Sequence, residues 1–181
     1  VLQHEIPLET VHYVIEFCYE KGIKIVLNPA PAAAVPMEII DKVTYVTPNE
    51  HEAVLIFGDE LSTEDLLRKY PEKLVITQGS RGVSTCLKDG QILNVPARKA
   101  QVVDTTGAGD TLNGAFSVQI AEGKAIEDAL AYANVAASLS TEKFGAQTGM
   151  PTAEEVETAL KILNGESVEK EIPVEMELIT K

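Results

Sequence analysis

The sequence predicts an α/β fold in which helices cover both faces of a mostly parallel central sheet, giving three layers. Short apolar runs typical of buried strands alternate along the 181 residues with longer segments of helical periodicity. Polar residues follow three of the expected strands, at the sheet edge where ligands bind in such folds: Asn28, Thr47 and Thr77. Apolar residues make up 45% of the chain, which is enough for one core. We therefore expect one domain over residues 1–181.

The first segments alternate as the fold class requires. Residues 1–3 are expected to belong to a strand that is already under way. Residues 8–21 carry apolar side chains at helical spacing, and Gly22 ends this expected helix. The β-branched runs at 23–27 and 43–46 predict two buried strands, because each is short and bounded by turn residues.

Two capped helices and a strand follow. Asn49 is an expected N-cap for a helix that runs to about Phe57, where Gly58 ends it. Ser62 or Thr63 caps a further helix to about Lys69. Residues 74–76 are apolar and predict the next buried strand.

The last segments comprise a hairpin and three helices. Asp89-Gly90 is a hairpin signal between two expected strands at 83–87 and 92–95. Helical patterns follow at 109–122, 125–143 and 152–163. The acidic residues 165–181 are expected to form an edge strand or a loose tail.

Composition and charge limit the partners. The formal net charge is -13 and the sequence pI is about 4.6, a balance that repels the nucleic-acid backbone. Cys18 and Cys86 lie far apart without metal-ligand spacing, which indicates a reduced, cytoplasmic compartment. No apolar run approaches membrane-spanning length. We thus expect neither a nucleic acid nor a membrane as partner. Because the first residue is Val1 and a strand is under way there, the sequence is expected to be a piece of a longer protein.

The segment Asp104-Thr105-Thr106-Gly107-Ala108-Gly109-Asp110 has the most specific chemistry of the chain. Its glycines allow a tight turn that brings backbone N–H groups together, and the helix that follows adds free donors and a positive dipole end. Gly107, Ala108 and Gly109 would thus form an anion hole. The carboxylate of Asp110 beside it could take a proton from a hydroxyl that receives a phosphoryl group. The alternative is a glycine-rich loop with a helix-capping Asp.

Five segments together resemble the ribokinase family, the PfkB-type carbohydrate kinases. Besides the glycine-rich run, they are Asn28-Pro29-Ala30-Pro31, Thr47-Pro48-Asn49-Glu50-His51-Glu52-Ala53, Thr77-Gln78-Gly79-Ser80-Arg81-Gly82-Val83 and Gly145-Ala146-Gln147. They stand in the family's order over nearly the whole chain. The resemblance implies a ribokinase-like fold and ATP-dependent phosphorylation of a sugar hydroxyl, with D-ribose to D-ribose 5-phosphate as the first expectation.

The resemblance also implies roles for individual residues. Asp110 would be the catalytic base and touch the sugar, which Glu5 would also contact unless it is a solvated charge. Glu52 would hold Mg²⁺ through water. The implied nucleotide-binding residues are Asn49, Thr77, Gly79, Ser80, Arg81, Gly82 and Asn134. Asn49 is also a helix cap, and the helix of Asn134 could serve packing alone.

A potassium site is implied as well. Asp104 and Thr106 would form it together with carbonyl groups near Ser140, Lys143, Gly145 and Gly149. A carboxylate and carbonyl oxygens suit a large hard cation, although Asp104 could equally be a turn residue.

The sequence departs from the family in one large respect. Family members carry an N-terminal half with most of the sugar-binding residues and a β lid that often builds a dimer. These N-terminal strands and the lid are absent here, so we expect this chain alone to be impaired and poorly stable or self-associating, and the parent protein to dimerise through the lid. The alternatives are a fructokinase or another sugar or nucleoside kinase of the family, and a non-catalytic nucleotide-binding fragment.

Overall fold

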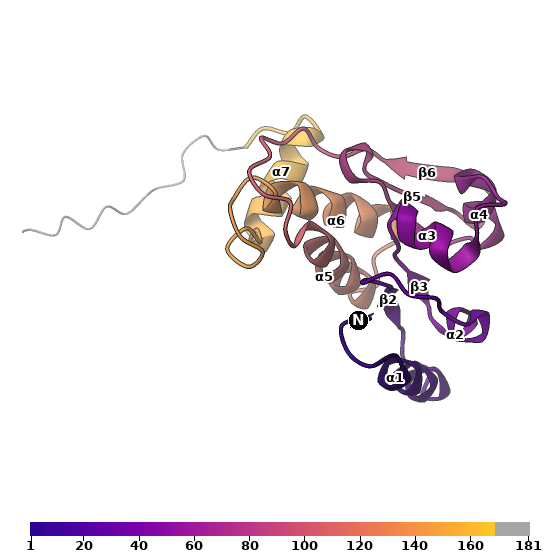
Figure 1. Ribbon diagram of the computed structural model, residues 1–181. Helices are drawn as coiled ribbons and strands as arrows, with labels where there is room; N and C mark the ends of the chain where they lie inside the picture. Colours follow the sequence, from indigo (N-terminus) through magenta and orange to yellow (C-terminus); the bar gives the residue numbers. More distant parts are fainter. Residues whose placement is uncertain (169–181) are drawn as a thin grey trace, which may run out of the picture.

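A central sheet runs through the computed structural model, which describes residues 1–168 (Figure 1). Strands β1 (Leu2–Gln3), β2 (Val26–Asn28) and β3 (Tyr45–Val46) pair in parallel in that order. Strands β4 (Val75–Thr77), β5 (Val83–Cys86) and β6 (Ile92–Val95) pair antiparallel. Two parallel bridges, Val46 to Leu74 and Asn49 to Thr77, join the two halves. The order along the sheet is therefore the order along the chain.

The direction of the second half follows from the length of its connections. Only residues 78–82 separate β4 from β5, and a parallel crossover needs a dozen residues or more. The chain must therefore turn straight back after β4. The hairpin predicted from Asp89-Gly90 joins β5 to β6. The predicted parallel arrangement applies to β1, β2, β3 and the bridges to β4, while alternation along the sequence did not indicate the antiparallel partner of β4.

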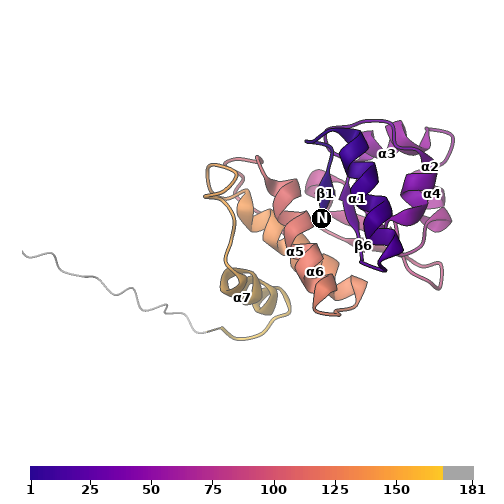
Figure 2. The same ribbon diagram turned by 90° about the horizontal axis from the view of Figure 1, so that it is seen from below.

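Helices cover both faces of the sheet, which makes the three layers expected from the sequence (Figures 1 and 2). On one face lie α1 (Leu8–Glu20), α2 (Met37–Lys42), α3 (Glu50–Phe57) and α4 (Thr63–Lys69). On the other face lie α5 (Ala108–Ala121) and α6 (Ile126–Ser140), with α7 (Ala153–Leu163) packed against α6. Adjacent strand residues point to opposite faces: Leu27 packs below α1, and Val26 packs below α5.

Several elements differ from the prediction. The strand expected at 23–27 begins only at Val26, and α2 was not expected, since its six residues are too few to show a helical period. The helix expected to reach residue 143 ends at Ser140, because the Thr141 carbonyl accepts hydrogen bonds from Val103 and Asp104 instead. Residues 165–168 form no strand, and the rest of the expected tail, 169–181, lies outside the described residues. Within residues 1–168, no helix has the length and apolar character needed to cross a membrane.

Candidate active site

A glycine turn leads directly into α5. Gly107 is the N-cap residue in the left-handed conformation (φ 79°), and a Cβ there would lie 3.0 Å from the Ala146 Cα. The turn thus needs glycine for its conformation and for its contact with residues 145–147. Within the described residues, the backbone N–H groups of Gly107, Gly109 and Asp110 have no protein acceptor, whereas that of Ala108 donates to the Thr105 carbonyl at 3.2 Å.

A pocket of about 690 Å³ lies beside this turn. The β4–β5 turn, residues 97–102, the start of α5 and the side of α6 enclose it. Seven of the residues implied by the resemblance line it: Thr77, Gly79, Ser80, Gly82, Ala108, Gly109 and Asn134. Free N–H donors of a helix N-terminus therefore lie at the wall of a cavity of ligand size.

The conformation of the β4–β5 turn depends on glycine. Gly82 has φ 94°, and a Cβ there would lie 2.0 Å from the Val95 carbonyl oxygen. Arg81 in the same turn does not line the pocket and pairs with Glu50 of α3 at 2.5 Å. Of the expected nucleotide-binding residues in this turn, Arg81 therefore lies at the outer surface, whereas Gly79, Ser80 and Gly82 line the pocket.

Residues 97–102 form a pocket wall that sequence reasoning did not single out. Arg98 of this segment pairs with Glu142 at 2.9 Å, and the Glu142 carboxylate also accepts a hydrogen bond from the Gln101 backbone. Arg98 and Lys99 bring positive charge to the pocket of an acidic protein. No regular pattern marks this segment, so only the folded chain shows its position.

Asn49 and Glu52, which follow β3, act together as a helix cap. The Asn49 side chain accepts a hydrogen bond from the Glu52 backbone at 2.9 Å, and the Glu52 carboxylate accepts one from the Asn49 backbone at 2.8 Å. This capping box fixes the start of α3. Neither side chain lines the pocket. Glu52 is buried, yet Asn49 is its only hydrogen-bond partner in the described part of the chain, so its carboxylate keeps acceptor capacity.

Asn134 also has a packing role. It is buried on α6 and donates through Nδ2 to the carbonyls of Val95 at 3.2 Å and Pro96 at 2.8 Å. These bonds join α6 to the end of β6. Its side chain nevertheless lines the pocket, so both interpretations of this residue agree with its position.

Asp110 lies in the first turn of α5, is exposed and does not line the pocket. Its Oδ1 accepts a hydrogen bond of 2.7 Å from Nε2 of Gln3. Glu5 is exposed in the turn that follows β1 and is not at the pocket either. The pocket and the Asp110 carboxylate therefore lie on different sides of the start of α5.

Sequence reasoning missed a buried polar pair under the same helix. The hydroxyl of Thr47, after β3, lies 2.5 Å from Oδ1 of Asn113, and Nδ2 of Asn113 donates to the Gly109 carbonyl at 2.9 Å. Both side chains are almost fully buried. The polar character of Asn113 within an otherwise apolar helix was the available signal.

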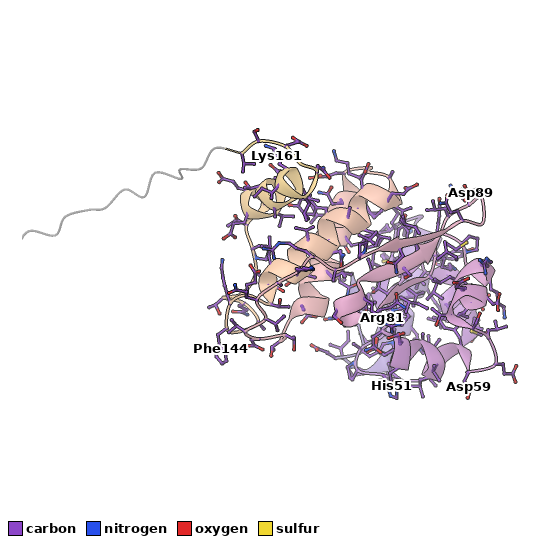
Figure 3. All side chains as sticks on the ribbon, turned by 90° about the horizontal axis from the view of Figure 1, so that it is seen from above. His51, Asp59, Arg81, Asp89, Phe144 and Lys161 are labelled. Carbon is purple, nitrogen blue, oxygen red and sulfur yellow. The ribbon has the colours of Figure 1, made fainter. Side chains whose placement is uncertain are left out.

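The loop between α6 and α7 packs against the glycine-rich run. The Asp104 carboxylate accepts hydrogen bonds from the Thr106 backbone, from the Thr106 hydroxyl and from the Gly145 backbone. These bonds hold the pKa of Asp104 below its usual range, and the bond from the Thr106 backbone has the largest effect. A Cβ built on Gly149 would lie 2.7, 2.8 and 3.5 Å from the carbonyl oxygens of Ser140, Gly145 and Lys143. Phe144 lies at the outer end of this loop (Figure 3).

The class of protein defined by this arrangement is a three-layer α/β protein in which a glycine turn and a helix terminus with free N–H groups lie beside a pocket. A family model described as pfkB family carbohydrate kinase matches residues 1–153. The chain belongs to this family.

Relatives named as ribokinases are similar to this chain over most of its length. The ribokinases of Bacillus subtilis (strain 168) and Lactococcus lactis subsp. lactis (strain IL1403) are 52% and 50% identical over 160 and 164 residues, or 88% and 90% of this chain. A solved structure of Arabidopsis thaliana ribokinase complexed with ribose and ATP is similar at a TM-score of 0.80 and 31% identity, covering 88% of this chain and 55% of that chain. The chain spans about half the length of the curated relatives, 54% of each.

Proposed function

We propose that the protein to which this chain belongs transfers the γ-phosphoryl group of ATP to a sugar hydroxyl, with D-ribose as acceptor and D-ribose 5-phosphate as product. The name of the Bacillus relative and the ribose and ATP named for the Arabidopsis structure support this choice of substrates. Family membership supports the reaction class.

One observation carries the proposal. The start of α5 separates the pocket, which Ala108 and Gly109 line, from the Asp110 carboxylate on the other side. A nucleotide in the pocket would thus direct its terminal phosphate at the free N–H groups of Gly107 and Gly109, while an acceptor would approach from the side of Asp110. These donors would stabilise the charge on the transferring group.

The proposed transfer accounts for the proton of the acceptor and for the bonds formed and broken. Asp110 accepts the proton of the sugar hydroxyl, the hydroxyl oxygen forms a bond to the γ-phosphorus, and the bond from the γ-phosphorus to the bridging oxygen breaks. ADP and the sugar phosphate are the products. Because the proton moves to a carboxylate held in the first helical turn, the base and the phosphate donors keep a fixed relation.

The described residues also fit the two cations that the family resemblance implies. The spare acceptor capacity of buried Glu52 suits a hydrated Mg²⁺, which would neutralise phosphate charge when bound. The carbonyl groups of Ser140, Lys143 and Gly145 come together beside Gly149, and a cluster of carbonyl oxygens is the kind of donor set that suits K⁺. The Asp104 bond to Gly145 would keep this loop beside the anion hole.

The Asp110→Asn variant of the native full-length gene product tests the proposal. We expect nearly all turnover of ribose to be lost, with ATP affinity close to that of the unchanged protein, in a coupled ADP-release assay and by calorimetry. Asp128→Asn is the matched control, because Asp128 is also exposed in the first turn of a helix, α6. Retained turnover in Asp110→Asn would exclude Asp110 as the base. ATP binding by the unchanged protein without transfer to ribose, fructose or a nucleoside would instead support a non-catalytic nucleotide-binding function.

A further inference from the structure

We propose that Gln3 is a positioning residue that orients the carboxylate of Asp110 toward the acceptor hydroxyl. The inference rests on the proposed function, since it gives Gln3 a role in the same reaction. The two residues are 107 positions apart in the sequence and meet through a single hydrogen bond of 2.7 Å.

The strand pleat explains why Gln3 reaches this carboxylate. Leu2 packs into the core on the face covered by α1, so the next side chain along β1 points to the opposite face, where α5 lies. Gln3 is the last residue of β1 and pairs with Asn28 of β2. It therefore projects at the carboxyl edge of the sheet, beside the first turn of α5.

The backbone of Gln3 is held against β2 and the turn that follows it. Gln3 pairs with Asn28 in the β1–β2 ladder, and the following residue, His4, donates its backbone N–H to the Ala30 carbonyl at 2.8 Å. His4 is also buried. This support fixes the point from which the Gln3 side chain reaches α5, and its hydrogen bond to Asp110 can then hold the carboxylate in one orientation.

The chemistry of an amide suits this position. Nε2 of Gln3 donates to Oδ1 of Asp110, which leaves Oδ2 for the proton of the acceptor. Without a donor, a carboxylate samples a broad range of χ2 angles. A lysine would add a charge that stabilises the carboxylate and weakens it as a base, and a glutamate would repel it. The neutral donor orients the group without repelling it and stabilises the charged carboxylate less than a cation would.

The Gln3→Met variant of the native full-length gene product tests the inference, because it keeps the length of the side chain and removes the donor. We expect kcat for ribose to fall by about 10- to 100-fold, as for a misplaced catalytic group. The KM for ATP and the melting temperature should stay unchanged, since Gln3 lies outside the pocket and only partly buried. The matched control is Gln119→Met at the far end of α5, where the amide also faces a carboxylate, Glu122, at 3.4 Å.

Combination with Asp110→Asn separates the possible outcomes. If Gln3 acts through Asp110, Gln3→Met should have little further effect in the Asp110→Asn background. An unchanged kcat in Gln3→Met, or an equal loss in Gln119→Met, would overturn the inference while Asp110→Asn still loses turnover. A loss accompanied by a lower melting temperature and a raised KM for ATP would also overturn it, because that pattern indicates a structural role. Retained turnover in Asp110→Asn would instead exclude Asp110 as the base, and no ribose-dependent ADP release by the unchanged protein would contradict the proposed function itself.

Discussion

The buried hydrogen bond between Thr47 and Asn113 allows a quantitative test of how α5 is fixed to the sheet. Thr47 has one hydroxyl proton and lies 2.5 Å from Oδ1 of Asn113 but 3.3 Å from the Leu27 carbonyl, so the shorter contact is the main bond. Thr47→Val leaves Oδ1 of Asn113 buried without a donor, at a cost of about 1–3 kcal/mol. Asn113→Leu removes this bond and the bond to the Gly109 carbonyl, at about 0.5–1.5 kcal/mol each.

The double variant should cost less than the sum of the two single variants. Once both polar groups are absent, no stranded acceptor remains, so we expect a coupling of about 1–2 kcal/mol. Urea unfolding of the unchanged protein, the two single variants and the double variant, monitored by circular dichroism, gives the four free energies of unfolding. The thermal midpoints should fall by about 2–4 °C for each kcal/mol.

A second cycle provides the control. Ser138 of α6 is buried and bonds to the Asn134 carbonyl at 2.8 Å, and its hydroxyl does not share a hydrogen-bond partner with Thr47, so Thr47→Val and Ser138→Ala should be additive. If the free energies of Thr47→Val and Asn113→Leu also add to within about 0.5 kcal/mol, the bond does not couple β3 to α5 and the reasoning is refuted.

Two further predictions concern the cation site and the pH dependence of stability. Gly149→Ala in the native full-length gene product should abolish the response of turnover to KCl, because the added Cβ lies 2.7 Å from the Ser140 carbonyl. The control Gly114→Ala adds its Cβ in open space on α5 and should keep the KCl response. A normal KCl response of Gly149→Ala would contradict the cation site. Burial lowers the pKa of His4 below its usual value of 6.5, so the unfolded chain binds this proton more readily; the contribution to stability is present above about pH 6.5 and is lost on acidification through the folded pKa. Thermal midpoints measured between pH 8 and 5 should depend less on pH in His4→Gln than in His51→Gln, the exposed control, and equal slopes would exclude His4 as the cause.

Local signals predicted those parts of the fold that depend on neighbours in the sequence. The cap at Asn49 and the glycine at position 58 define α3 because both ends of the helix are encoded within ten residues. The antiparallel direction of β5 depends on loop length, which the alternation of strands and helices does not express. The helix α2 was missed because six residues carry too little periodicity.

The candidate site likewise has parts that depend on neighbours in the sequence and parts that depend on distant residues. The turn around Gly107 was predictable, because its glycines and the following helix are adjacent in the sequence. Gln3 and Asn113 act through partners that are 107 and 66 positions away, and no single-sequence pattern encodes such a distance. The family resemblance implies a nucleotide contact for Arg81, which pairs with Glu50, a neighbour that the bridge between the sheet halves brings close.

The position of the glycine turn, where we propose that a phosphate binds, is set by three contacts from different parts of the chain. Ala146 packs against Gly107 from the loop after α6, the Thr47–Asn113 bond holds the first turns of α5 to β3, and Gln3 holds Asp110 from β1. An acidic protein with a net charge of -13 gains from such rigidity, because fixed N–H donors attract a phosphate without reorganisation. Loss of one contact should therefore lower kcat more than ATP affinity, since binding tolerates small displacements of the donors that phosphoryl transfer does not.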